Sequence, residues 1–244
     1  MVQLTALVAL SLNALLASSA SLAARKDSKT HGVTCGCDLK KSTTVSMHLP
    51  TNQTALVQPT TPPRYVAIGV GYQNYTCNSA TSTFASIGAV ATLFDLSCIE
   101  GKSDFETIAQ RSYNVWISPA EGHAKADVVG AKVGTPSILG YHYFINSPTT
   151  AGAINAKWDF TSTGSHKGDA TAFVVGAKVG NIPAPAPADP KVTVDWLMLN
   201  GIPGFDALAS QVFRVDTVGG QPPASCAAGA APIQVKYVAK YFLY

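Results

Sequence analysis

The side chains best suited to acid–base chemistry are a histidine and an aspartate, each within a run of apolar residues. His142 lies between Tyr141 and Tyr143, and a carboxylate such as Asp95 beside its ring would make it a general base. A histidine in a sheet more often forms a structural hydrogen bond, so catalysis is the weaker interpretation. The chain also lacks the Gly-x-Ser-x-Gly sequence of a serine hydrolase and a recognisable glycosidase carboxylate pair. His142 and Asp95 are therefore weak catalytic candidates, and no catalytic residue is assigned firmly.

A second possible chemistry is dinucleotide binding, because a strand-like run ends in Gly69-x-Gly71. A Rossmann fold needs a third glycine and a helix N-terminus after this pair, but the chain continues with NYTC at residues 74–77. The five histidines form no pair at metal-ligand spacing. We therefore predict neither a cofactor-binding site nor a metal site.

Two sequence signals place the protein outside the cell. An uncharged apolar run at residues 4–17 precedes small residues that suit signal peptidase, which predicts a signal peptide over residues 1–24. Because this start carries no basic residue, an apolar anchor helix is the alternative. Asn52 and Asn74 each begin an Asn-x-Thr acceptor for N-glycosylation. No later apolar run is long enough to cross a bilayer, so we predict a secreted glycoprotein with no membrane span after cleavage.

The five cysteines lie at positions 35, 37, 77, 98 and 226. In an oxidising compartment four of them would form two disulfides. We predict that Cys77 pairs with either Cys98 or Cys226. Cys35 and Cys37 have the close spacing of a redox or metal-binding dithiol, but no second ligand pair stands at zinc-site spacing, which favours a structural role.

Aromatic residues are the remaining candidates for binding. Exposed rings stack on sugars through their apolar faces and hydrogen-bond through their polar tips. Rings that alternate along a strand more often fill a core, and this is the stronger interpretation. The candidates are Tyr72, Tyr75, Tyr113, Trp116, Tyr141, Tyr143, Trp158, Trp196, Tyr237, Tyr241 and Tyr244.

The sequence predicts that most of these residues lie on β-strands. Alternation is clearest at the C-terminus, where Lys236 and Lys240 fall on the polar face of a half-buried strand. A capping box from Ser103 to Glu106 predicts one short helix. The expected strands cover residues 65–70, 87–96, 141–145, 157–160, 170–175, 192–198, 212–217 and 233–243.

The composition of the chain and the positions of its proline-rich stretches predict one domain. Residues 25–63 are polar and end in a proline-rich stretch, which predicts an N-terminal arm before a single β-rich domain at residues 64–244. The proline-rich segment 182–190 is interpreted as a surface crossover within that domain. The heptapeptide VVGAKVG occurs at residues 128–134 and again at 174–180, which we interpret as two similar strand-and-turn segments of one sheet.

The charge balance excludes one class of partner. Charged residues make up 13% of the chain and the net charge is +3, without a basic cluster. Nucleic-acid binding proteins concentrate lysine and arginine on one face, so nucleic acid is not an expected partner.

Six ordered motifs carry a resemblance to a family of fungal secreted proteins of unknown function. They are GVGYQNYTC at 69–77, GAVATLFD at 88–95, GYHYF at 140–144, WL at 196–197, RVDTVGG at 214–220 with Pro223 and Cys226, and VKYVAKYF at 235–242. The resemblance covers residues 64–244. Members of that family are often labelled malate dehydrogenases, a label that conflicts with the missing third glycine and the missing helix. The resemblance implies no catalytic residues.

The sequence thus predicts an antiparallel all-β protein, a β-sandwich or barrel with one short helix. We expect it to act at the fungal cell wall or in the host apoplast by binding a glycan or a host protein. The alternative is a secreted hydrolase of polysaccharides or esters that uses His142 or a carboxylate pair.

Overall fold

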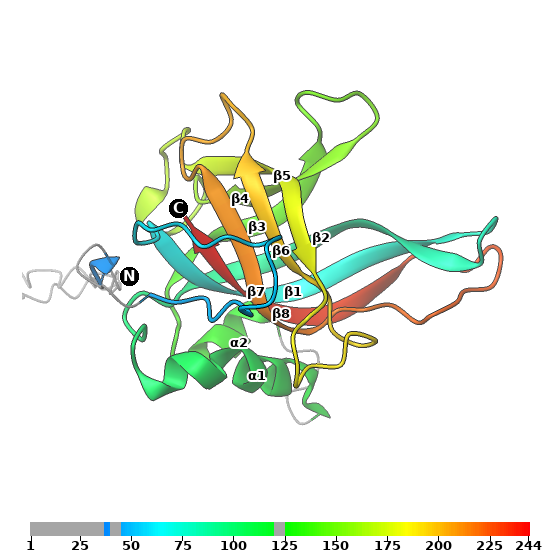
Figure 1. The fold of residues 1–244 in the computed structure, drawn as a ribbon, viewed down its shortest axis with the longest axis horizontal. Coiled ribbons are helices and arrows are strands. Elements are labelled where there is room, and N and C mark those ends of the chain that lie inside the picture. Colours follow the sequence, from blue (N-terminus) through cyan, green and yellow to red (C-terminus); the bar gives the residue numbers. More distant parts are fainter. Residues whose placement is uncertain (1–36, 40–44, 120–124) are drawn as a thin grey trace, which may run out of the picture. The chain divides into compact units, whose positions relative to one another are not determined.

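Eight antiparallel strands form a closed barrel in this computed structural model, which describes residues 37–39, 45–119 and 125–244. Each strand pairs with the next along the chain, and β8 closes the barrel against β1 (Figure 1). The strands are β1 (Tyr65–Asn78), β2 (Thr83–Asp95), β3 (Ile138–Asn146), β4 (Ile154–Asp159), β5 (Phe173–Ile182), β6 (Trp196–Gly201), β7 (Gln211–Gly219) and β8 (Ile233–Leu243). The predicted antiparallel all-β fold is confirmed, and it takes the form of a barrel. The predicted signal peptide and Cys35 lie outside the described residues.

Two helices lie between β2 and β3 and cover the outer side of the barrel. The helix α1 (Ser103–Ile117) contacts β1, β7 and β8, and α2 (Ala126–Lys132) contacts β1 and β2. The helix predicted from residue 103 is therefore present, but the capping box does not form, because Lys102 is the N-cap and no side chain caps the helix. The buried Phe105 and Ile108 instead hold α1 against the barrel, so packing rather than capping fixes its position.

The two copies of VVGAKVG have different structures, which overturns our interpretation of both as strand-and-turn segments. The first copy lies largely in α2 and the second lies within β5. In α2 the buried side is Val129 and Gly130, which pack on the outside of the barrel; in β5, Val174 and Val175 are both buried. Because a short segment has only weak intrinsic preferences, its surroundings decide its conformation.

The barrel separates two apolar clusters. The inner cluster fills the barrel with Trp158, Phe160, Tyr237 and Tyr241 against small residues of β1 and β2. Gly69 is one of these: a Cβ at this position would lie 2.5 Å from Cε2 of Tyr241, so the glycine makes room for that ring. The glycine pair that suggested a nucleotide fingerprint therefore serves the packing of the barrel.

The outer cluster lies between the barrel and α1, and it changes the expected character of β8. We predicted a half-buried strand with lysines in solvent, but both faces of its C-terminal half are buried. The side chain of Lys240 is 1% exposed, with Nζ 2.8 Å from Oδ2 of Asp216 and 4.0 Å from the centre of the Phe105 ring. An ion pair thus lies where α1 covers the strand.

The segment before β1 contains no helix or strand from residue 45 to residue 64, as expected for an arm, but it contributes to the outer cluster through Met47 and Leu56. The side chain of Gln58 bonds the backbone of Val45 and Met47 and folds the segment back on itself. Apolar side chains at positions 47 and 56 therefore secure a stretch that is mostly polar.

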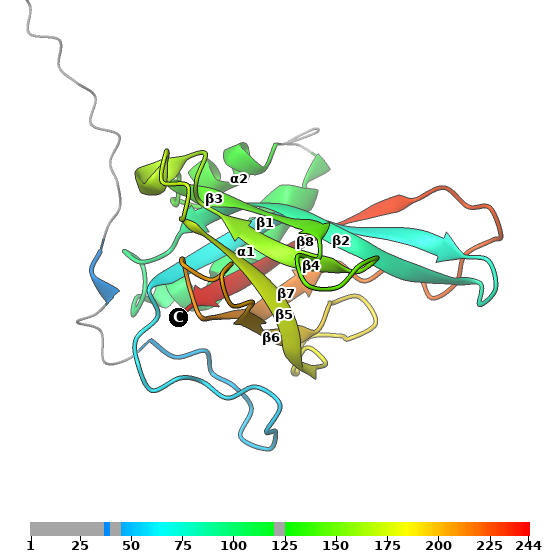
Figure 2. The same cartoon turned by 90° about the horizontal axis from the view of Figure 1, so that it is seen from above.

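Two disulfides join distant parts of the chain. Cys77 pairs with Cys226, one of the two partners considered for it, and Cys98 pairs with Cys37. The first bond lies where β1, β2 and β8 extend beyond the other strands (Figure 1, Figure 2). The second ties the segment before the barrel to the turn after β2.

Candidate functional site

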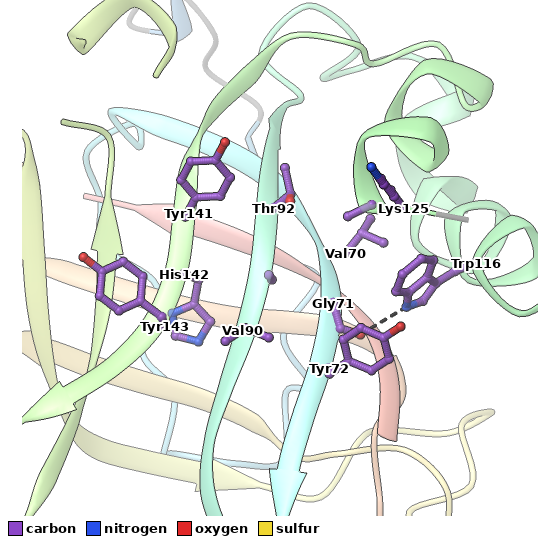
Figure 3. Close-up of a pocket in the computed structure, with 12 residues that line it drawn as sticks. Val70, Gly71, Tyr72, Val90, Thr92, Trp116, Lys125, Tyr141, His142 and Tyr143 are labelled. Carbon is purple, nitrogen blue, oxygen red and sulfur yellow. Dashed lines mark hydrogen bonds between the residues drawn. The ribbon is translucent and has the colours of Figure 1, made fainter. Parts of the chain in front are cut away.

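A groove lined largely by aromatic residues lies on the outer face of β1, β2 and β3, and we call it the aromatic groove. It encloses about 550 Å³ and is bounded on one side by the end of α1 and the start of α2 (Figure 3). Its lining is Val70, Gly71, Tyr72, Val90, Ala91, Thr92, Trp116, Lys125, Ala126, Tyr141, His142 and Tyr143.

The strand register places the aromatic side chains of the groove on one face. Tyr72 of β1 lies opposite Val90 of β2, and Thr92 of β2 lies opposite Tyr141 of β3. Because side chains alternate between the two faces of a strand, residues two apart share a face, so Tyr143 lies on the same side as Tyr141. Three adjacent strands therefore present tyrosines and short side chains on the outer face of the barrel.

Trp116 forms a fixed wall of the groove. Its Nε1 donates to the carbonyl oxygen of Gly71 at 3.1 Å, and its ring meets the edge of Tyr72 at 5.3 Å between centroids. Lys236 donates to the carbonyl oxygen of Trp116 at 2.7 Å and lies 4.6 Å from the centre of its ring. Only 3% of Trp116 is exposed, whereas 40% of Tyr141 is exposed. Tyr141 is thus the ring that a ligand can cover.

A polar network borders the groove beyond Tyr143. The hydroxyl of Tyr143 donates to Oδ2 of Asp159 at 2.6 Å, and Nζ of Lys157 lies 2.9 Å from the same oxygen. Burial raises the pKa of Asp159, but hydrogen bonds from Tyr143, Lys157 and Thr161 outweigh it and hold this pKa well below its usual range. The carboxylate therefore stays ionised and fixed beside Tyr143.

His142 has a structural environment. Its ring stacks on Trp158 at 4.5 Å between centroids, and its Nδ1 is 2.9 Å from the carbonyl oxygen of Lys157. Burial lowers the pKa of His142 to about 4, so the ring is neutral at pH 7. It sits among the aromatic residues of the barrel interior, although it also contributes to the lining of the groove.

The structure does not bring Asp95 to His142. Ala91 pairs with His142, and Asp95 lies four residues further along β2, about 13 Å away at the rise of a strand. Oδ1 of Asp95 accepts from the backbone of Ser97 at 2.8 Å, and burial raises its pKa despite that bond. The described residues also contain no group of three or more metal-ligating side chains.

Most of the aromatic candidates serve the core, as the stronger interpretation expected. Trp158, Tyr237 and Tyr241 lie inside the barrel, and Trp196 belongs to the outer cluster. Four of the candidates gather at the groove: Tyr72, Trp116, Tyr141 and Tyr143. Sequence reasoning missed Thr92 and Lys125, because nothing in their local pattern shows that α2 lies beside β2.

The two expected glycosylation sites differ in exposure. Asn52 lies in an exposed turn before the barrel. Asn74 lies within β1, where its Oδ1 accepts from Nε2 of Gln234 at 3.1 Å. Because a glycan is attached to Nδ2, glycosylation of Asn74 would leave Oδ1 able to accept this bond.

Comparison with known proteins defines the family. The protein is an antiparallel eight-stranded barrel with an aromatic groove on its outer face. Residues 59–244 match the model of a family described as "Protein of unknown function (DUF3455)", and the chain belongs to this family. No curated protein and no solved structure matches the chain. Among the described residues, no helix is long and apolar enough to cross a membrane.

Proposed function

We propose that the protein is a secreted carbohydrate-binding module that takes a cell-wall glycan in its aromatic groove. The observation that carries the proposal is the exposed ring of Tyr141, beside Thr92 and Tyr143, with Tyr72 and the wall of Trp116 on the other side of β2 (Figure 3). A sugar ring has an apolar face bounded by hydroxyls, and an exposed tyrosine offers the matching apolar face with a polar tip.

The polar groups around the groove suit the hydroxyls of a glycan. Thr92 and Lys125 line the groove, and Lys157 and Asp159 border it beside Tyr143. Thus a hydroxyl and an ammonium group lie beside an apolar floor, the arrangement typical of small-molecule sites, while the buried carboxylate of Asp159 fixes Tyr143. The volume of about 550 Å³ lies within the range of roughly 300–1,000 Å³ for such sites.

Two further features support an extracellular location. Disulfides persist in oxidising compartments, and the described residues contain two of them. The predicted signal peptide and the exposed acceptor Asn52 agree with secretion. The resemblance in the sequence points to the fungal cell wall or the host apoplast as the place of action.

Retention on insoluble polysaccharides tests this function. Purified protein is incubated with chitin, cellulose, β-1,3-glucan and xylan, and both the bound fraction and the soluble sugar released are measured. We expect retention on one polymer without release of sugar. Tyr141→Ala should lower the affinity for this polymer about tenfold. A tenfold loss corresponds to about 1.4 kcal/mol, which is within the range for one aromatic contact. Tyr141→Phe should retain most of it.

The matched control is Val192→Ala, which truncates an apolar side chain that is 57% exposed and outside the groove. This variant should bind as the wild type does. Equal retention of Tyr141→Ala and wild type would refute the groove as the site. Release of soluble sugar would instead favour the hydrolase, in which case His142→Asn should abolish the release.

A further inference from the structure

A second cavity opens at the end of the barrel where β1 leads towards β2, and we call it the mouth cavity. It encloses about 490 Å³, and its lining includes Gln73 of β1, Lys178 of β5 and Arg214 of β7. An eight-stranded barrel has room for one small ligand where side chains do not fill it. This cavity shares no lining residue with the aromatic groove.

The guanidinium of Arg214 is held in place without a carboxylate partner. Its Nε and Nη2 donate to the carbonyl oxygen of Asp195 at 3.1 and 2.9 Å, which leaves Nη1 without a partner among the described residues. No carboxylate oxygen of the described residues lies within 4.0 Å of Arg214, and the carboxylate of Asp195 accepts from Asn181 at 2.7 Å. Arginine is the side chain best suited to bind a carboxylate through fixed donors.

The amide of Gln73 supplies a second donor at the same cavity. Gln73 is only 5% exposed, and its Nε2 makes no well-formed hydrogen bond with a described residue and interacts only weakly with the Tyr237 hydroxyl. A buried donor without a partner costs about 1–3 kcal/mol, so a ligand oxygen that accepts from it would be stabilising.

The charge and the walls of the cavity define the class of ligand. Lys178 and Arg214 are the cations of its lining and Asp195 is its carboxylate, so the lining carries a net charge of +1 from two cations and one anion. The remaining walls include Phe84, Phe144 and Leu199. Donors and positive charge at one side, with apolar rings at the other, suit an acid with a short apolar body.

We propose that the mouth cavity binds a small free organic carboxylate with an apolar body, whose charge pairs with Arg214 and whose oxygen accepts from Gln73. The ligand occupies the barrel interior, so it binds independently of a glycan in the aromatic groove.

Calorimetric titration with hexanoate tests the proposal, with hexanol as the neutral match and glucuronate as the polar acid. We expect saturable binding of hexanoate, and at least tenfold weaker binding of both hexanol and glucuronate. Equal affinity for hexanoate and hexanol would overturn recognition of the charge. Tighter binding of glucuronate than of hexanoate would overturn the claim that the ligand has an apolar body. If hexanoate shows no saturable binding up to about 10 mM, well above a millimolar Kd, the claim that the mouth cavity binds a carboxylate is overturned.

Two variants separate binding from folding. Arg214→Gln should raise the Kd for hexanoate at least tenfold, but it also removes bonds to the backbone of Asp195. Gln73→Met removes a buried donor that makes no well-formed hydrogen bond, so the variant should fold with about the stability of the wild type and still bind hexanoate more weakly. Unchanged affinity in a folded Gln73→Met would contradict the role of the amide. Tyr141→Ala should leave hexanoate binding unchanged, which distinguishes failure of this site from failure of the aromatic groove.

Discussion

Replacing Lys240 and replacing Asp216 should have different effects on stability, although the two side chains form one ion pair. The Lys240 side chain is 1% exposed and the Asp216 side chain is 29% exposed, with 2.8 Å between Nζ and Oδ2. Removing one partner of a buried pair costs about 3–5 kcal/mol, because the other charge remains buried without compensation. That cost applies only where the remaining charge stays buried, and Asp216, unlike Lys240, is partly exposed to water.

The perturbation is Asp216→Asn, compared with Lys240→Met. Residue 216 has φ +47°, a region that asparagine tolerates, so the backbone should not change. We expect Asp216→Asn to lower the free energy of unfolding by about 2–3 kcal/mol, somewhat less than full removal, because the amide oxygen can still accept from Nζ. Lys240→Met should change it by less than about 1 kcal/mol, since Asp216 regains water and the thioether packs on Phe105.

Urea unfolding of the two single variants and the double variant measures this difference through the midpoint at constant m. In the double variant the cost of Asp216→Asn should largely disappear, which gives a coupling of about 2 kcal/mol. If Lys240→Met is as destabilising as Asp216→Asn, or if the double-mutant cycle shows no coupling, the assignment of an uncompensated buried charge is refuted.

Three further predictions concern the barrel. Burial lowers the pKa of His142 from 6.5 to about 4, so the unfolded chain binds more protons than the folded one between these pH values. The free energy of unfolding should therefore fall by up to about 3 kcal/mol as the pH is lowered from 6.5 to 4. Urea midpoints of His142→Gln should lack this decline. Gly130→Ala should destabilise by about 1–2 kcal/mol in thermal unfolding, despite the better helix propensity of alanine, because a Cβ would collide with the ring of Phe94. Replacing Cys77 and Cys226 together by alanine should cost up to about 5 kcal/mol in guanidinium unfolding, from a loop with a sequence separation of 149; a cost near zero would contradict the pairing.

The strands were predictable because their residues alternate, and the structure confirms the antiparallel class. The sequence did not show which faces of the strands are buried under the helices. The alternation of β8 places Lys240 on the outer side correctly, but only the packing of α1 shows that this side is buried. The two copies of VVGAKVG make the same point, since one heptapeptide forms a helix on the barrel and a strand within it.

The sequence predicted that a binding site would be aromatic, but it did not predict which aromatic residues line the groove. Tyr141 and Tyr143 were candidates from the sequence, yet the same criteria also selected rings that fill the barrel. Trp116 joins the groove because α1 returns to β1, where its indole bonds the backbone of Gly71. Such contacts join residues 45 positions apart, and no local pattern encodes them.

The most direct test of the proposed function is to map a bound glycan on the protein. Backbone and side-chain NMR shifts would be followed while an oligosaccharide of the retained polymer is titrated. We expect saturable changes at Tyr72, Thr92 and Tyr141, with Asn155 and Lys178 of the mouth cavity unchanged. Changes confined to the mouth cavity, or glycan binding without any change at Tyr141, would contradict the claim that the aromatic groove is the binding site.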